Sequence, residues 1–174
     1  NLRVIPFNEK GELLMEEFDK LLDDSVKIIA ITYVSNSLAT VNPVEEIIAK
    51  AHAKNIPVLL DAAQAVQHMP LSVQKLDADF IVFSGHKMFW PSAIGVLYGK
   101  EEWLNKLPPY QGGGDMIKSV SFEKTIYNEL PFKFEAGQPD ISGAIVLGYA
   151  VDYINQIGIE RIHATEEDLM NYAI

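Results

Sequence analysis

The residues of this sequence best suited to chemistry are polar side chains that follow apolar runs, where strands of a sheet would end. They are Asn36 after the run 26–34, Asp61 and Gln64 at the end of 56–61, and Ser84, His86 and Lys87 at the end of 79–85. An amine can condense with an aldehyde to give a Schiff base. A carboxylate can keep a pyridine nitrogen protonated, which makes the ring an electron sink, and a hydroxyl beside an imidazole can hold a phosphate. Together these side chains suit pyridoxal phosphate.

Each of these side chains also has a structural interpretation. A strand-end aspartate such as Asp61 commonly caps the helical turn that follows it. Ser84 and His86 can bond to loop backbone, and a single lysine is usually a solvated surface charge. Taken one at a time, the structural interpretations are favoured. However, ligands of open α/β sheets bind at the carboxyl ends of the strands, so the convergence of these groups at one edge favours a site.

The strands that must position this set are apolar runs. Residues 26–34, 56–61 and 79–85 are nearly continuous apolar stretches, and the first is typical of a strand covered on both faces. Further strands are predicted over 2–7 and 93–99. The loop between the last two strands of the chain is too short for a crossover helix, so we expect that pair to be antiparallel or non-adjacent.

Helices are predicted between these strands. One covers 11–24, and a second covers 42–55 with Asn42 as its capping residue and Pro43 in its first position. A third covers 143–157. Its predicted apolar face consists of Ile145, Tyr149, Ala150, Tyr153, Ile154 and Ile157.

Strands that alternate with helices at this spacing predict an α/β fold, a three-layer sandwich with a mostly parallel sheet, in a single domain over 1–174. Between 108 and 142 the periodicity disappears, in a stretch that holds "PPYQGGG" and "EAGQPD". A long irregular segment in a compact domain usually binds a ligand or contacts a partner.

The composition argues against several classes of function. The formal net charge is −10 and the sequence pI is about 4.8, which disfavours nucleic acid and anionic membranes as partners because both attract lysine and arginine. No apolar run reaches membrane-spanning length. Cysteine is absent, which excludes disulfides and thiolate metal sites and favours the cytoplasm. The four histidines lack zinc-ligand spacing, so we predict no metal.

Four stretches of the sequence together resemble a known family. They are "LLDAAQAVQHMPLSVQKLDADFIVFSGHKMF", "VSNSLATVNPV", "YQGGGDMI" and "FEAGQPDISGAI". They resemble the class V, fold-type I aminotransferases, in particular the branch of cysteine desulfurases and selenocysteine lyases, over essentially the whole chain. The resemblance implies an enzyme that uses pyridoxal phosphate to convert L-cysteine to L-alanine. It also implies an enzyme-bound persulfide for iron–sulfur cluster assembly, and a cytoplasmic homodimer.

Residue by residue, the resemblance implies roles for the strand-end side chains. Lys87 matches the lysine that binds the cofactor aldehyde and acts as base at the substrate Cα. Asp61 matches the aspartate paired with the pyridine nitrogen, and Gln64 matches the residue that contacts the ring 3′-oxygen. Ser84 and His86 match phosphate ligands.

The substrate end of the site is less complete than the cofactor end. Asn36 matches an asparagine near the substrate carboxylate. The family's phosphate loop and ring-stacking histidine lie upstream of the matched region, and its carboxylate-binding arginine and persulfide cysteine lie downstream. We therefore expect the chain to be the central part of the family's large domain, truncated naturally or by design.

Larger residues stand at several positions where the family has small ones. They are Trp90, Ala93, Ala62 and Ala39 in place of glycine, Gln138 in place of threonine, and the bulky residues Ile126, Val146 and Tyr149. A position that needs a positive φ is strained by any residue but glycine, and larger apolar groups can fill space left by missing neighbours. The alternative hypothesis is therefore a truncated or redesigned α/β scaffold or assembly module that binds no cofactor.

Overall fold

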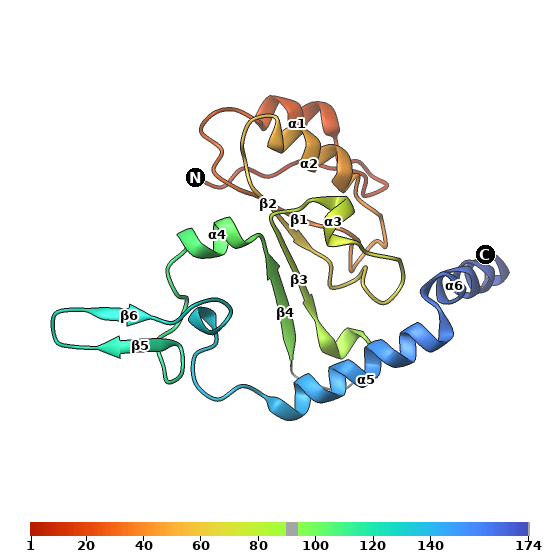
Figure 1. Cartoon of the computed structure of the whole chain (residues 1–174). Coiled ribbons are helices and arrows are strands. Elements are labelled where there is room, and N and C mark those ends of the chain that lie inside the picture. The colour runs from red at the N-terminus through yellow and green to blue at the C-terminus, as the bar shows by residue number, and fades with distance from the viewer. Residues whose placement is uncertain (90–93, 174) are drawn as a thin grey trace.

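A four-stranded sheet forms the centre of the chain. The computed structural model describes residues 1–89 and 94–173, so Trp90 and Ala93 lie outside the described residues. In spatial order the strands are β1 (Ile29–Thr32), β2 (Val58–Asp61), β3 (Phe80–Ser84) and β4 (Gly95–Gly99). The first three strands are parallel, and β4 pairs antiparallel with β3 (Figure 1). The α/β class with a mostly parallel sheet is confirmed, and the pair at the edge of the sheet is antiparallel.

Helices α1 (Met15–Leu21) and α2 (Val44–His52) pack on one face of this sheet. Along β1 the burial alternates, since Ile29 and Ile31 are buried whereas Ala30 is exposed. The prediction that this strand is covered on both faces is therefore wrong at Ala30. The physical reason is that successive side chains of a strand point to opposite faces, and α1 and α2 cover only one of them.

The N-terminal residues do not form the strand predicted over 2–7. Regular pairing there is limited to one isolated bridge between Phe7 and Leu13. Pro6 has no backbone N–H to donate to a ladder, and no described strand lies beside this segment. The first helix is also shorter than the predicted 11–24.

Asn42 does not cap α2 as predicted. The N-cap residue is Pro43, which makes no side-chain capping bond. Nδ2 of Asn42 donates instead to the carbonyl oxygen of Thr32 at 2.8 Å, and the residue is buried. The start of α2 is thereby fixed to the end of β1.

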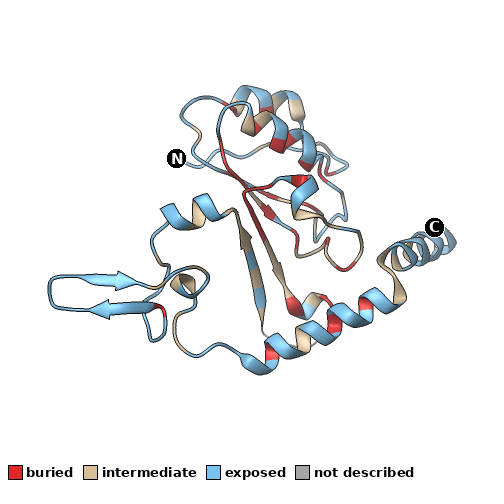
Figure 2. Ribbon diagram, viewed as in Figure 1, coloured by how far each residue is buried: buried red, intermediate tan, exposed pale blue. Residues whose placement is uncertain are grey.

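The second half of the chain is more open than the first. It contains α4 (Glu101–Lys106), a hairpin of β5 (Ile117–Val120) and β6 (Thr125–Tyr127), α5 (Ile141–Ile157) and α6 (Ile159–Ala173), whereas the short helix α3 (Val73–Leu76) lies between β2 and β3 in the first half. The hairpin corrects the prediction of an irregular segment over 108–142. All residues of its strands are exposed (Figure 2). The sequences of these two strands lack the alternation of apolar and polar residues that indicates a half-buried strand, which is why the hairpin was not predicted.

Helix α5 passes the carboxyl ends of the parallel strands (Figure 1). Its Gly143, Ala150 and Ile154 are buried, whereas Ile145 and Tyr149 of the predicted apolar face are exposed. The predicted face is therefore split into a buried side and an exposed side. Tyr149 is 69% exposed, so it does not fill interior space as we expected of the bulky residues.

Asp79 is a buried ionic group that joins the sheet to two helices. Its carboxylate accepts hydrogen bonds from the backbone N of Val58 at 2.8 Å and from Nε1 of Trp103 at 3.0 Å. Nε2 of His52 lies 2.9 Å from it and Nζ of Lys100 lies 3.3 Å from it. Burial acts to raise the pKa of Asp79, but the bonds from His52 and Val58 and the charge of Lys100 outweigh it, so this pKa lies below its ordinary value.

Candidate functional site

The polar residues after β1, β2 and β3 lie at one edge of the sheet. The register pairs Thr32 with Asp61 and Asp61 with Val82, so the three strands end side by side. Directly after β3 comes a short 3₁₀ turn, Gly85–Lys87. The convergence predicted from the strand ends is therefore present in the backbone.

Asn36 and Gln64 are brought together from the turns after β1 and β2. Nε2 of Gln64 donates a hydrogen bond to Oδ1 of Asn36, which is 28 positions away in the sequence. Oε1 of Gln64 in turn accepts a bond from Nε2 of Gln67 at 3.3 Å. Our sequence reasoning missed Gln67. The spacing of three residues in "QAVQ" could have indicated it, because residues three apart face each other on a helical turn.

The two carboxylate oxygens of Asp61 have different surroundings. Its Oδ1 accepts a hydrogen bond from the backbone N of Ala63 at 2.9 Å, so it caps the turn that follows β2. Within the described part of the chain its other oxygen, Oδ2, has no hydrogen-bond or ion-pair partner, and the residue is exposed. One oxygen is therefore structural, and the second is free to pair with a cationic group.

Ser84 and His86 form a hydrogen-bonded pair, with 2.6 Å between Oγ and Nδ1. In the tautomer that carries its proton on Nε2, the ring accepts this bond from the hydroxyl and keeps an N–H for another acceptor. In the tautomer that carries it on Nδ1, the ring donates this bond and the hydroxyl keeps its own hydrogen for another acceptor. Lys87 is the next residue and is half-buried. Its amine makes no hydrogen bond or ion pair to any residue that the structure describes, so it is not engaged in a surface salt bridge.

Gly85 is required by the close packing around this turn. A Cβ atom there would lie 2.9 Å from Cγ2 of Ile94 and 3.0 Å from its carbonyl oxygen. Leu147 of α5 would lie 3.4 Å from the same atom. Because Ile94, the residue before β4, and Leu147 of α5 both approach this closely, they fix the turn that carries His86 and Lys87.

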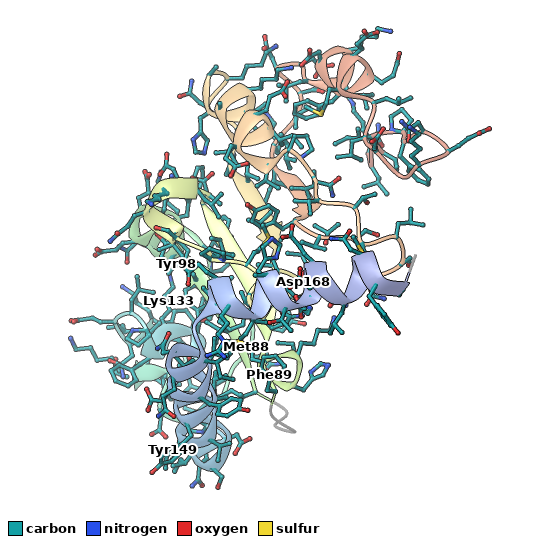
Figure 3. All side chains as sticks on the ribbon, turned by 90° about the vertical axis from the view of Figure 1, so that its right-hand side faces the viewer. Met88, Phe89, Tyr98, Lys133, Tyr149 and Asp168 are labelled. Carbon is teal, nitrogen blue, oxygen red and sulfur yellow. The ribbon has the colours of Figure 1, made fainter. Side chains whose placement is uncertain are left out.

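The backbone is strained directly after Lys87. Phe89 has a φ of 61°, in the left-handed region that disfavours bulky residues. Figure 3 shows Met88 and Phe89 next to each other; Met88 is buried and Phe89 is 52% exposed. Strained residues cluster at functional sites, and this one lies two residues from Lys87.

Within the described residues, the polar side chains after β3 are not hydrogen-bonded to those after β1 and β2. Among the described residues, no hydrogen bond or ion pair joins Ser84, His86 or Lys87 to the other strand-end side chains. The strand register alone places the two groups at a common edge. A free carboxylate oxygen, an amine and a hydroxyl–imidazole pair are together the groups that pyridoxal phosphate needs, so the residues present fit this cofactor.

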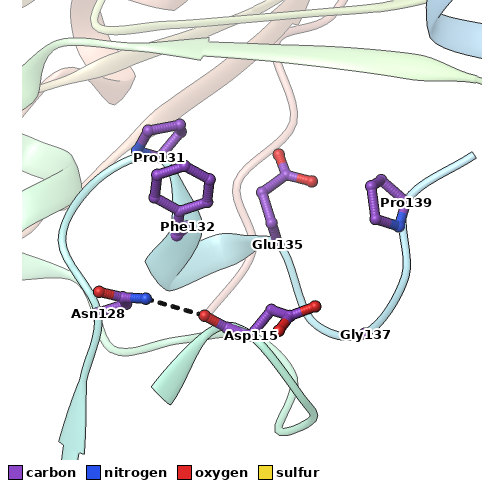
Figure 4. A pocket seen from close by; sticks show the side chains of 7 residues that line it. All are labelled: Asp115, Asn128, Pro131, Phe132, Glu135, Gly137 and Pro139. Carbon is purple, nitrogen blue, oxygen red and sulfur yellow. Dashed lines mark hydrogen bonds between the residues drawn. The ribbon is translucent and has the colours of Figure 1, made fainter. Parts of the chain in front are cut away.

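A separate hollow of about 620 Å³ lies in the segment 108–142 (Figure 4). It is lined by Asp115, Asn128, Pro131, Phe132, Glu135, Gly137 and Pro139. Nδ2 of Asn128 donates to the backbone oxygen of Asp115 at 2.9 Å. The lining includes none of the strand-end residues, so the hollow is distinct from the site at the sheet edge.

In residues 1–89 and 94–173, no three acidic, histidine or cysteine side chains gather as a metal ion would require. None of the helices described here has the length and apolar character needed to cross a membrane.

Comparison with known proteins identifies relatives over the whole chain. The family described as "Aminotransferase class-V" matches residues 1–174. The chain is 51% identical to a cysteine desulfurase of Dickeya dadantii (strain 3937), over 99% of this chain and 42% of that protein. It is 52% identical to a cysteine desulfurase of Enterobacter sp. (strain 638), over 99% of this chain and 43% of that protein.

Solved structures of cysteine desulfurases also resemble this chain in fold. The apo structure of a cysteine desulfurase from Thermococcus onnurineus NA1 has a TM-score of 0.93 at 38% identity, covering 99% of this chain and 43% of that chain. A cysteine desulfurase from Escherichia coli has a TM-score of 0.86 at 36% identity, covering 90% of this chain and 39% of that chain. This chain therefore spans less than half the length of the relatives it matches.

Proposed function

The chain belongs to the aminotransferase class-V family, and from this premise we propose that it carries the pyridoxal-phosphate site of a cysteine desulfurase. The observation that carries the proposal is the amine of Lys87, which is half-buried, has no partner among the described residues and follows the Ser84–His86 pair. Asp61 keeps one carboxylate oxygen free at the same sheet edge. The proposal is also supported by relatives that share half of this sequence and are cysteine desulfurases.

Five side chains would hold the cofactor. Lys87 would bind its aldehyde carbon, Asp61 would face the ring nitrogen, and Gln64 would donate to the ring 3′-oxygen. The Ser84–His86 pair would donate to the phosphate, through the Ser84 hydroxyl when Nδ1 of His86 carries the ring proton and through Nε2 of His86 in the other tautomer. When bound, pyridoxal phosphate supplies an electron sink that lets the Cα–H bond of an amino acid ionise. Asp61 would stabilise the positive charge of the ring nitrogen, and Lys87 would take the proton from Cα.

The proposed substrate is L-cysteine and the proposed product is L-alanine. Asn36 would hold the substrate carboxylate. A thiolate would attack the substrate sulfur, and the Cβ–S bond would break with its electron pair left on Cβ. Cβ would then take up a proton to become the methyl group of alanine, and the sulfur would stay on the attacking thiol as a persulfide. The chain contains no cysteine, so that thiol must lie outside these 174 residues.

The same proposal includes a cytoplasmic homodimer that delivers sulfur for iron–sulfur cluster assembly. Support for a partner comes from exposed aromatic side chains in and near the segment 108–142. Tyr110 is 89% exposed, and Phe122 on the hairpin is fully exposed. Apolar side chains gathered on a surface commonly mark a protein interface.

The test is a spectroscopic titration. Pyridoxal phosphate added to the chain should give a visible absorption band that is absent in Lys87→Ala and present in Lys75→Ala, since Lys75 is exposed on α3. A band that persists in Lys87→Ala would contradict the assignment of Lys87. If no band forms at saturating cofactor, the alternative of a scaffold that binds no cofactor is correct for this chain.

A further inference from the structure

Gln67 has a buried side-chain amide whose oxygen is unsatisfied in hydrogen bonding within the part of the chain that the structure describes. The residue is 4% exposed, and its Oε1 has no hydrogen-bond partner among the described residues. An unpaired buried acceptor is destabilising, because it has given up its hydrogen bonds to water without replacing them. An apolar side chain of the same size would fill this position without that cost, so the amide calls for an explanation outside packing.

The bond that Gln67 does make fixes the orientation of a second amide. Its Nε2 donates to Oε1 of Gln64 at 3.3 Å. A side-chain amide carries its acceptor on one side and its donor on the other. With Oε1 turned towards Gln67, Nε2 of Gln64 must point away from it, and it does so in its bond to Oδ1 of Asn36.

The other end of this chain of amides cannot determine the orientation. Asn36 is exposed, and its side chain makes no other hydrogen bond within the described residues. Its amide can therefore turn to offer either a donor or an acceptor to Gln64. Gln67 is buried, so among these three amides it is the one whose position is fixed by the fold.

We propose that Gln67 is a positioning residue that turns the donor of Gln64 outward. The sheet edge then presents an N–H group, which suits an oxygen with negative charge such as the ring oxygen of the cofactor. The identity of that acceptor rests on the proposed function. The orientation of Gln64 does not, because it follows from contacts within the chain.

The orientation can be tested without cofactor by ¹⁵N NMR of the Gln64 side-chain amide, assigned by its loss in Gln64→Glu. We expect its order parameter to fall from about 0.8 in the parent chain to below about 0.6 in Gln67→Met. Gln74→Met is the matched control, because Gln74 is exposed on α3 and makes no side-chain hydrogen bond in the described structure. An unchanged order parameter in Gln67→Met would overturn the proposal.

A second variant keeps the test decisive if Gln67→Met does not fold. Asn36→Ala removes the exposed partner and leaves Gln67 in place. The amide of Gln64 should then remain ordered, because the buried bond is intact. Loss of its order in Asn36→Ala would show that Asn36 fixes the amide, and the proposal would be wrong.

Cofactor binding links the orientation to function. Gln67→Met should weaken pyridoxal phosphate binding about fivefold, which corresponds to about 1 kcal/mol, while Gln74→Met should leave the affinity unchanged. Equal affinity in Gln67→Met and the parent chain would overturn the role of Gln67 towards the cofactor. If the parent chain itself binds no pyridoxal phosphate, the proposed function fails, and the NMR result still decides the orientation.

Discussion

The hydroxyl of Ser84 lies 2.6 Å from Nδ1 of His86, one residue before Lys87. This bond joins the last residue of β3 to the turn that follows it. It holds two groups that can donate to a phosphate next to an amine that can bind an aldehyde. The relationship distinguishes the phosphate end of the proposed site from its ring end, and the two ends can be tested separately.

Ser84→Ala should weaken binding of pyridoxal phosphate about tenfold, because a hydrogen bond to a charged group is worth about 1.5–3 kcal/mol. Binding of pyridoxal, which lacks the phosphate, should not change. Both affinities can be measured by absorbance titration. Ser119→Ala on the exposed hairpin is the control, and an equal loss for both ligands would contradict a phosphate-specific role.

Variants of Asp61 should separate its cap from its charge. Asp61→Asn keeps an oxygen for the N–H of Ala63, so the free energy of unfolding should change by less than about 0.5 kcal/mol. Asp61→Ala loses the cap and should lose about 1 kcal/mol. Cofactor affinity should fall more than about tenfold in both variants, since each removes the charge that faces the ring nitrogen. Normal affinity in Asp61→Asn would limit Asp61 to its structural role.

Asp79 should make the fold sensitive to acid. Its pKa is lower in the folded chain than its ordinary value, so the unfolded state binds a proton first as the pH falls. The stabilisation is therefore complete above the unfolded pKa of about 3.9 and is lost as the pH falls towards the folded pKa.

Asp79→Asn should cost about 2 kcal/mol at pH 7 because it removes the buried charge that pairs with His52 and Lys100, which then keep, within the described residues, only the exposed carboxylate of Asp77. The difference from the parent chain should shrink at pH 3. Urea unfolding at the two pH values measures both quantities. A difference that does not depend on pH would show that the charge of Asp79 does not contribute.

Ala39→Gly should stabilise the chain by about 1 kcal/mol. Ala39 has a φ of 55°, where an L-residue costs about 1–2 kcal/mol relative to glycine. Ala49→Gly is the matched control, because Ala49 is exposed in the middle of α2 and should lose about 1 kcal/mol there. Denaturant midpoints compare the two, and destabilisation by Ala39→Gly would contradict the strain.

The sequence predicted the strands of the sheet well because their signals are local. Apolar runs over 26–34, 56–61 and 79–85 contain β1, β2 and β3. The prediction from sequence failed where a strand forms only if another strand lies beside it. The strand predicted over 2–7 is the example, because no described strand lies beside that segment. It also failed for the hairpin of β5 and β6, whose exposed faces leave no apolar period.

Sequence alone determined which chemical groups could meet, because strands in a parallel sheet end at a common edge and their last residues are known from the apolar runs. It could not determine which of them touch. The bond from Gln64 to Asn36, the division of Asp61 between a cap and a free oxygen, and the burial of Gln67 depend on turns that lie far apart in the sequence. Only the tertiary structure decided these, because side-chain direction follows from packing around the turns rather than from residue type.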